Sequence, residues 1–268
     1  MGNNKGELFR EERLQLILKS LLARKKVLVT DLVREFEVSA STIRLDLAEL
    51  ETRGLLSRTH GGAILPEKID NELITSKNIL ALREETQTEE KDAIAQAVLN
   101  LIHDGDSIMI DGGSTTARVA QRLGQRRKLT IITTSYHLLP ILLEISDATI
   151  YVTGGLVHRD FKDFVGEISL DSISRFHTDI TVIGIDGVSV KQGLTTPDIM
   201  MAQVKKKMIA LSKKLVVVAD QSKMGKVCLV PVAPLDSSFT IITDGQVDID
   251  FIEQIRSLGT KVIVAPAD

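Results

Sequence analysis

Apolar residues recur at helical spacing in the first part of the chain. In residues 12–23 (ERLQLILKSLLA), polar Arg13, Gln15 and Lys19 separate the members of an apolar stripe. Such a stripe is typical of an amphipathic helix that packs one face on a core. The stripe consists of Leu14, Ile17, Leu18, Leu21 and Leu22. The pattern therefore predicts a first helix.

Two shorter helices are predicted next, each preceded by a hydroxyl residue. Thr30 precedes the amphipathic run 31–36, and Ser39 precedes the run 40–54. Both residue types are favoured N-caps, and two capped helices joined by a tight turn indicate a helix-turn-helix. Residues 55–65 (LLSRTHGGAIL) have apolar ends around a polar centre, which predicts a β-hairpin, or wing.

The pattern changes near residue 81. Seven short, continuously apolar runs alternate with segments of helical composition, which indicates a parallel sheet covered by helices on both faces. These runs are residues 107–111, 129–133, 149–154, 180–186, 214–220, 239–244 and 261–266. We therefore expect an α/β protein with a winged helix-turn-helix domain at 1–65, a linker at 66–80 and a mostly parallel open-sheet domain at 81–268.

The second helix of a helix-turn-helix enters the major groove with its first residues facing the bases. If Ile43 and Leu47 point inward, Ser41, Thr42 and Arg44 are free to face outward, where arginine reads guanine and hydroxyls bond bases or phosphates. The candidate DNA-binding residues are Thr30, Ser39, Ser41, Thr42, Arg44, Arg58 and His60, the last two at the hairpin tip. A small helical bundle or a protein-binding module is the alternative interpretation of the same three helices.

Residues 111–116 (DGGSTT) lie between a predicted strand and a predicted helix. Glycines allow close backbone approach and amides at a helix start favour anions, so the loop fits a phosphate group. An ordinary strand-to-helix turn is the alternative, because the chain has neither a P-loop nor a dinucleotide fingerprint. Polar residues also follow the later strands, and ligands bind beyond the carboxyl ends of parallel strands, so we expect these groups to converge. The candidate effector-binding residues are Asp111, Gly113, Ser114, Thr115, Thr116, Thr134, Ser135, Gly154, Gly155, Asp186, Gly187 and Lys223.

Charge changes this picture only slightly. The 268 residues have a net charge of −3, divided into +2 for residues 1–66 and −5 for the remainder. A mildly basic N-terminal part suits a DNA-binding domain without establishing one. No run approaches the ~20 apolar residues of a membrane helix and the start of the chain is polar, so a cytoplasmic protein is expected. A single cysteine, Cys228, and scattered histidines predict no disulfide, metal or cofactor.

The N-terminal part resembles the DNA-binding domain of the DeoR family of bacterial transcription regulators. The most specific segments are residues 38–47 (VSASTIRLDL) and 58–63 (RTHGGA). The family usually has a second basic residue after Arg44, where this chain has Leu45. The resemblance implies operator binding, and the departure bears on which operator is read.

Residues 81–244 are similar to the effector domain of the same family, in segments that include 83–91 (REETQTEEK), 111–116 and 219–225 (ADQSKMG). The resemblance implies a fold shared with ribose-5-phosphate isomerases and a small phosphosugar as inducer. Thr134 stands where the family commonly has Asn, and Met201 where it commonly has Glu. We expect these departures to alter which hydroxyl groups of the ligand are recognised.

Together these features predict a transcriptional repressor of a carbohydrate-utilisation operon that binds double-stranded operator DNA as a homodimer or homotetramer. Because helix-turn-helix proteins pair on palindromic sites, two-fold symmetry is expected. A phosphorylated sugar would relieve repression. The alternative is a sugar-phosphate isomerase with an accessory DNA-binding domain, but residues 198–208 offer only one carboxylate, Asp198, and no Glu as general base. The chain is therefore expected not to be an enzyme.

Overall fold

The computed structural model of the chain describes residues 10–24, 26–52, 56–64, 83 and 86–266. The chain divides into two compact units, residues 1–82 and 83–268. The expected linker, residues 66–80, lies outside the described residues.

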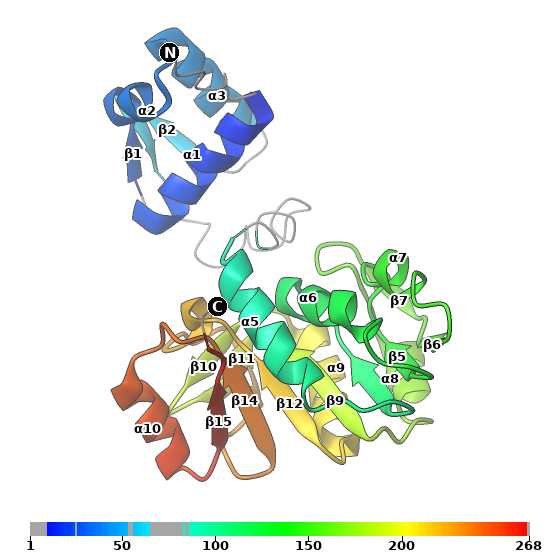
Figure 1. Ribbon diagram of the computed structural model, residues 1–268. Coiled ribbons are helices and arrows are strands. Elements are labelled where there is room, and N and C mark those ends of the chain that lie inside the picture. Colours follow the sequence, from blue (N-terminus) through cyan, green and yellow to red (C-terminus); the bar gives the residue numbers. More distant parts are fainter. Residues whose placement is uncertain (1–9, 25, 53–55, 65–82, 84–85, 267–268) are drawn as a thin grey trace, which may run out of the picture. The chain divides into compact units, whose positions relative to one another are not determined.

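The first unit contains three helices and a small antiparallel sheet (Figure 1). Its elements are α1 (Arg10–Arg24), β1 (Lys26–Leu28), α2 (Val29–Phe36), α3 (Ala40–Thr52), β2 (Ser57–Thr59) and β3 (Gly62–Ile64). The strands follow the order β1-β3-β2. The predicted helices and wing are confirmed, whereas β1 was not expected.

The core of this unit forms because each helix buries one apolar stripe. Leu14 and Ile17 of α1, Leu32 of α2, and Ile43 and Leu47 of α3 belong to one buried cluster. Burying a side chain of this kind stabilises the fold by about 1.5–3 kcal/mol. The predicted stripes are therefore the packing faces of the helices.

The expectation that Thr30 caps the second helix was wrong. Pairing of β1 with β3 extends the chain up to Leu28, and the amide of Val29 then donates to the carbonyl oxygen of Gly61 at 2.9 Å. The helix α2 starts at Val29, and Leu28 occupies the N-cap position without a side-chain cap. Thr30 consequently lies inside the first turn, where its side chain is exposed.

The second unit is built on a seven-stranded sheet with the order β15-β14-β12-β9-β4-β5-β6. All six neighbouring pairs are parallel. The strands are β4 (Ser107–Ile110), β5 (Thr130–Thr133), β6 (Thr149–Val152), β9 (Ile180–Gly184), β12 (Leu215–Val218), β14 (Phe239–Thr243) and β15 (Lys261–Val264). Each of the seven apolar runs found in the sequence supplies one of these strands, so the predicted α/β fold with a parallel sheet is confirmed.

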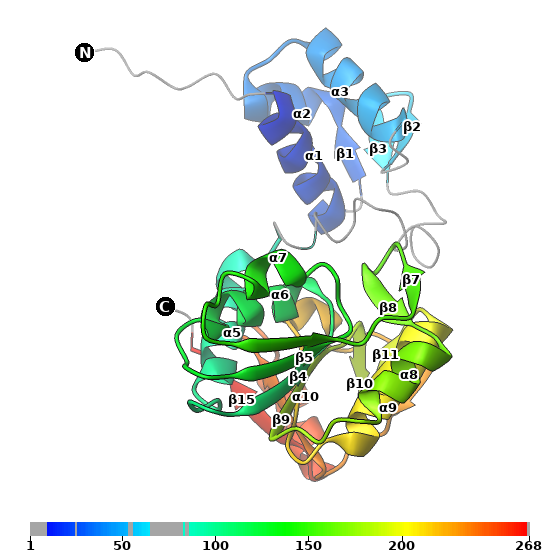
Figure 2. The same ribbon diagram turned by 90° about the vertical axis from the view of Figure 1, so that its right-hand side faces the viewer.

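Helices cover both faces of this sheet (Figure 2). Ile108 and Ile110 of β4 pack in a cluster with α5, α6 and α7, whereas Met109 packs in a second cluster with α8, α9 and α10. Side chains of a strand alternate between faces, so a strand buried on both sides is apolar at every position. The helices are α5 (Thr88–Leu99), α6 (Ser114–Leu123), α7 (Leu139–Leu142), α8 (Glu167–Ile173), α9 (Ile199–Leu211) and α10 (Ile249–Ser257).

Two smaller antiparallel sheets were not expected. One pairs β7 (Leu156–His158) with β8 (Asp163–Val165), and the other has the order β10-β11-β13. The latter consists of β10 (Gly187–Ser189), β11 (Gly193–Thr196) and β13 (Val230–Ala233). Short strands of this kind carry too few residues to show a clear period in the sequence.

Candidate functional site

The N-terminal end of α3 presents a group of hydroxyls to solvent. The Oγ atom of Ser39 accepts a hydrogen bond from the amide of Thr42 at 3.1 Å, which confirms the predicted cap. Its Oγ atom also lies 2.7 Å from that of Ser41 and 2.8 Å from Oγ1 of Thr42. Ser41 and Arg44 are exposed and Thr42 is half-buried, while Ile43 is buried. Polar groups that can contact a neighbouring molecule therefore sit on a fixed helix.

Two further candidates lie on the wing. Arg58 of β2 is held by Glu51 of α3, whose carboxylate accepts from the amide of Arg58 at 2.9 Å and from its Nε at 2.7 Å. These hydrogen bonds lower the pKa of Glu51. His60 is exposed in the turn between β2 and β3. The wing is thus tied to the C-terminal half of α3, and its tip remains open to solvent.

Leu45 is also on the outer face of α3, at the position where the family that the N-terminal part resembles usually has a basic residue. Its side chain is 66% exposed, although its neighbour Asp46 is buried and accepts a hydrogen bond from Arg13 at 2.6 Å. Because most of the Leu45 side chain lies outside the core, another residue can replace Leu45 without loss of packing.

The candidate site of the second unit lies where the chain reverses its direction of travel across the sheet. From β4 the chain adds β5 and β6 on one side, and it returns to place β9, β12, β14 and β15 on the other. The carboxyl ends of β4 and β9 therefore border the topological switch point, the usual ligand position in open α/β sheets.

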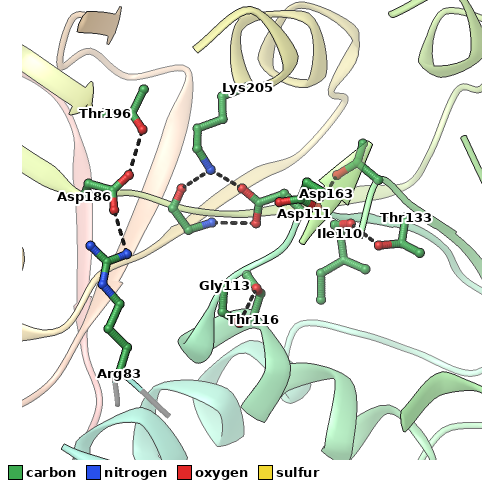
Figure 3. A network of polar contacts seen from close by, with 12 residues as sticks. Arg83, Ile110, Asp111, Gly113, Thr116, Thr133, Asp163, Asp186, Thr196 and Lys205 are labelled. Atoms are coloured by element: carbon green, nitrogen blue, oxygen red, sulfur yellow. Dashed lines mark hydrogen bonds and ion pairs between the residues drawn. The ribbon is translucent and has the colours of Figure 1, made fainter. Parts of the chain in front are cut away.

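A buried ion pair occupies this point (Figure 3). Asp111 follows β4 directly and pairs with Lys205 of α9, and both side chains are almost completely removed from solvent. The backbone of Gly184 connects them, because its amide donates to Asp111 at 2.9 Å and its carbonyl oxygen accepts from Lys205 at 2.9 Å. Burial opposes the charge on Lys205, but Asp111 and Asp186 outweigh it and raise the pKa of Lys205. The ion pair with Asp111 therefore favours the protonated form of Lys205.

A second ion pair lies at the end of β9 (Figure 3). Asp186 accepts from Arg83 at 3.0 Å and from the hydroxyl of Thr196 at 2.7 Å. Burial disfavours the carboxylate of Asp186, but Arg83 and Lys205 outweigh it and lower its pKa. The next residue, Gly187, is so close to β11 that a Cβ atom there would lie 2.5 Å from Oγ1 of Thr195. Asp186 is thereby fixed and ionised.

The loop after β4 leads into α6 through Gly113, whose φ of 154° suits glycine. No side chain caps this helix, and its first backbone hydrogen bond runs from Ala117 to Gly113. The hydroxyl of Thr116 donates a hydrogen bond to the carbonyl oxygen of Gly113 at 3.1 Å. Ser114 and Thr115 are buried in the first turn. The amide groups of this turn therefore remain available to an anion.

The loops after β5 and β6 lie side by side, because the amide of Thr153 donates to the carbonyl oxygen of Thr133 at 3.1 Å. Thr134 donates to Asp163 at 3.2 Å, and the hydroxyl of Ser135 donates to the carbonyl oxygen of Lys162 at 3.1 Å. Both hydroxyls are thus used within the protein. Gly154 and Gly155 have φ angles of 66° and 119° in the turn that leads to β7.

Lys223 ends the short 3₁₀ turn after β12 (Gln221–Lys223), which Asp220 caps. Burial lowers the pKa of Lys223, and Asp220 counteracts this effect. Nearby, Lys91 of α5 is buried and donates to the carbonyl oxygens of Arg83 and Thr86. Burial lowers the pKa of Lys91 to about 8. Lys91, Lys223 and Arg83 therefore lie close to the carboxylates of Asp186 and Asp220 at the carboxyl end of the sheet.

The candidate residues taken from the sequence did not include five charged residues of this site, Arg83, Lys91, Asp163, Lys205 and Asp220. Lys205 could have been found, because it falls on the same helical stripe as the buried Met201 and Met208. Met201 itself belongs to the apolar core, so its side chain takes no part in polar recognition. Arg83 and Asp163 lie in segments without a helical or strand period, and only the folded chain brings them to the switch point.

Two general features complete the description. In the part of the chain that the structure describes, no helix is long and apolar enough to cross a membrane. Among the described residues there is also no cluster of three or more His, Cys, Asp or Glu side chains arranged to hold a metal ion.

The chain thus combines a winged helix-turn-helix unit with a parallel-sheet unit that has a charged site at its switch point, which is the organisation of a transcription regulator with a sensor domain. Residues 13–69 match the family model of the DeoR-like helix-turn-helix domain, and residues 86–245 match that of the DeoR C terminal sensor domain. The chain belongs to the DeoR family of transcription regulators.

Named relatives of similar length are regulators or repressors. The HTH-type transcriptional repressor GlcR of Bacillus subtilis (strain 168) is 31% identical over 264 residues, 97% of this chain and 98% of that protein. The HTH-type transcriptional regulator GlpR of Haloferax volcanii is 35% identical, with 84% and 86% covered. The glycerol-3-phosphate regulon repressor of Escherichia coli (strain K12) is 34% identical, with 80% and 82% covered.

Among solved structures, ribose 5-phosphate isomerase A of Methanocaldococcus jannaschii is similar to part of the chain. The match covers 51% of this chain and 55% of that chain, with 21% sequence identity and a TM-score of 0.38. This likeness concerns the fold only.

Proposed function

We propose that the chain is a DNA-binding transcriptional repressor of a carbohydrate-utilisation operon, and that a phosphorylated sugar releases it from its operator. The observation that carries this proposal is the exposed N-terminal end of α3, where Ser41 and Arg44 project from a helix whose Ile43 and Leu47 are buried. This is the geometry with which a recognition helix reads base edges in the major groove.

For the DNA contact, we assign base reading to Arg44 and Ser41 and backbone contacts to Ser39, Thr42, Arg58 and His60. Thr30 remains a candidate for a phosphate contact from the start of α2, since its side chain is exposed there. Arginine contributes two parallel hydrogen bonds to guanine, and hydroxyls position the helix on phosphates. Two protomers, paired by a two-fold axis, would occupy the two half-sites of an operator. The protein would act in the compartment that holds the chromosome.

For the effector, we assign the phosphate group to the first turn of α6 and place Lys223 at the opposite end of the ligand. The free amides of this turn follow β4, and Lys223 follows β12, two positions away in the sheet order β12-β9-β4. Neighbouring strands are about 4.8 Å apart, so these two groups bracket a span of about 10 Å. Between them lie Asp111, Asp186 and Lys205, which suit the hydroxyl groups of a sugar. The site is therefore polar along the length of an extended phosphosugar.

An isomerase-like activity is the alternative function. Its general base would have to be a carboxylate, and Asp111 is unsuited because its two oxygens accept from Gly184 and Lys205. Asp163 is the specific observation in favour of this alternative, since burial, followed by the charge of Asp111, raises its pKa to about 7. Relatives named as regulators and repressors support the non-enzymatic function.

The experiment begins with selection of bound sequences from a random DNA library by the full-length chain. Arg44→Ala should weaken binding to the selected operator by about 1–3 kcal/mol and relax the preference at one base pair. Arg24→Ala, which removes the same charge from the end of α1, serves as the matched control and should retain the sequence preference. An unchanged preference in Arg44→Ala would remove α3 as the recognition helix.

The effector assignment is tested on the same complex. Phosphorylated sugars and polyols of three to six carbons are added to the chain on its operator, and at least one should release it. Thr115→Ala and Lys223→Ala should keep DNA affinity and lose this response. Conversion of any of these phosphates into an isomer by the purified chain would establish the enzymatic alternative instead.

A further inference from the structure

Asp163 is a completely buried carboxyl group that the site described so far does not explain. It is the first residue of β8, in the hairpin formed by β7 and β8. The hairpin is joined to the loop after β5 by a bridge between Ser135 and Asp163, and by a hydrogen bond of 2.7 Å from the amide of Phe164 to the carbonyl oxygen of Thr134. Asp163 is therefore held at the carboxyl edge of the sheet by backbone contacts.

Its two carboxyl oxygens are in different situations. Oδ1 accepts a hydrogen bond from Oγ1 of Thr134 at 3.2 Å. Oδ2 is buried and has no hydrogen-bond partner among the described residues. The hydroxyl of Ser135 is close enough to lower the pKa of Asp163, but its proton is directed to the carbonyl oxygen of Lys162. A buried polar atom without a partner is costly, so a ligand, an ion or a water molecule that hydrogen-bonds to it stabilises the protein.

The unpaired oxygen lies against the start of the proposed phosphate loop. A Cβ atom on Gly112 would be 2.4 Å from Oδ2 of Asp163 and 2.7 Å from Oγ of Ser135. Only glycine permits this approach, and the next residue, Gly113, is the N-cap of α6. Asp163 is also close enough to Asp111, the residue that follows β4, for the charge of Asp111 to raise its pKa (Figure 3). Oδ2 is thus next to the position where the phosphate end of an effector would bind.

The charges around Asp163 decide which kind of ligand group fits. Asp111 from β4 faces it with a negative charge, and Lys205 from α9 counteracts this charge. On the hairpin itself, Lys162 points to His137, with 3.5 Å between Nζ and Nδ1. A phosphate oxygen beside two carboxyl groups would be repelled. A hydroxyl group both donates and accepts, so it satisfies Oδ2 whether or not Asp163 carries a proton.

We propose that Asp163 is a specificity-determining residue of the effector site, where its Oδ2 atom binds a hydroxyl group of the sugar next to the phosphate. Thr134 orients the carboxyl group by donating to Oδ1. This proposal rests on the proposed phosphosugar-binding function. Thr134 stands where the DeoR family commonly has Asn. In this proposal its hydroxyl positions the carboxyl group of Asp163 and does not contact the ligand itself.

The test measures binding to the full-length chain by calorimetry. The probes are inorganic phosphate, a panel of phosphorylated sugars and polyols of three to six carbons, and the deoxy counterparts of the sugars that bind. The variants are Asp163→Ala and, as matched control on the same hairpin, Asp160→Ala. Asp163→Ala should weaken the tightest phosphosugar by about tenfold or more, because it removes the carboxyl group that bonds the hydroxyl. Its affinity for inorganic phosphate should change less than about twofold, and Asp160→Ala should behave as the wild type.

Discrimination provides the sharper readout. The wild type should prefer the sugar with the recognised hydroxyl over its deoxy counterpart, and Asp163→Ala should bind both alike. Equal preference in the wild type and the variant overturns the proposal, as does an equal loss of phosphate and phosphosugar binding. If Asp163→Ala does not fold, Thr134→Val, which keeps the shape of the side chain, should reduce the same discrimination. If the wild type binds no member of the panel, the phosphosugar function itself fails, a result distinct from an unchanged Asp163 variant.

Discussion

Lys205 and Asp111 form an ion pair with side chains that are only 4% and 0% exposed. The pair joins the end of β4 to α9 across the point where the sheet reverses its strand order. Because Gly184 hydrogen-bonds both partners, the pair also fixes the end of β9. The ends of β4 and β9 and the helix α9 are therefore connected at the switch point by contacts within the protein.

Removal of one partner should be far more damaging than removal of both. Lys205→Met leaves the carboxylate of Asp111 buried and uncompensated, which should cost about 3–5 kcal/mol of unfolding free energy. The double variant Asp111→Asn with Lys205→Met removes both charges and should recover a large part of this loss. Urea unfolding of the full-length chain measures both effects. A loss below about 1 kcal/mol for Lys205→Met would show that Asp111 is not ionised in the folded state.

Asp163 should make the stability of the protein depend on pH. Burial, followed by the charge of Asp111, places its pKa at about 7 instead of 3.8. A raised pKa means that the folded state holds the proton more tightly, so this contribution is complete below about pH 4 and is lost as the pH rises through about 7, at up to about 1.4 kcal/mol per pH unit. Asp163→Asn cannot titrate, so its stability relative to the wild type should increase from pH 5 to pH 8. A constant difference across this range would contradict the raised pKa.

Leu45 offers a gain of function in DNA binding. It is exposed on the same helix as Arg44, so Leu45→Arg should add one phosphate contact without disturbing the core. One further contact steepens the dependence of log affinity on log salt by about 0.9 and tightens binding at low salt. Leu45→Ala, which removes the side chain without adding charge, is the control and should keep the salt slope of the wild type. If Leu45→Arg has the slope of Leu45→Ala, this part of α3 does not face DNA.

Arg83 should influence how the effector acts on DNA binding. It is the first residue of the second unit and pairs with Asp186 in the candidate site, while its carbonyl oxygen accepts from the buried Lys91. An effector that binds Asp186 must rearrange this pair, at the place where the chain arrives from the first unit. Arg83→Ala should therefore bind phosphosugars but need a higher concentration to release the operator. Arg175→Ala, an exposed arginine of the same unit, should respond as the wild type; an equal response from both variants would assign the coupling elsewhere.

The periodicity of apolar residues was sufficient to predict most of the fold. The three helices, the wing and all seven strands of the parallel sheet follow from local patterns, because each element must bury a face or a stripe of fixed period. Ser39 as a cap and the loop 111–116 at a helix start were also evident from local chemistry. The start of α2 was misplaced because pairing of β1 with β3, a contact between distant residues, decides where that helix begins.

The sequence by itself thus determined the three N-terminal helices, the wing, the strands of the parallel sheet and the family's two domains, since these depend on neighbours in the chain. Only the tertiary structure decided which charges meet. Lys205 is one of three consecutive lysines, and packing of α9 alone selects it for burial beside Asp111. Arg83 reaches Asp186 over 103 residues of sequence, and Thr134 reaches Asp163 over 29. Such contacts leave no periodic trace, because a charge becomes part of a site only when the fold removes it from water and provides its partner.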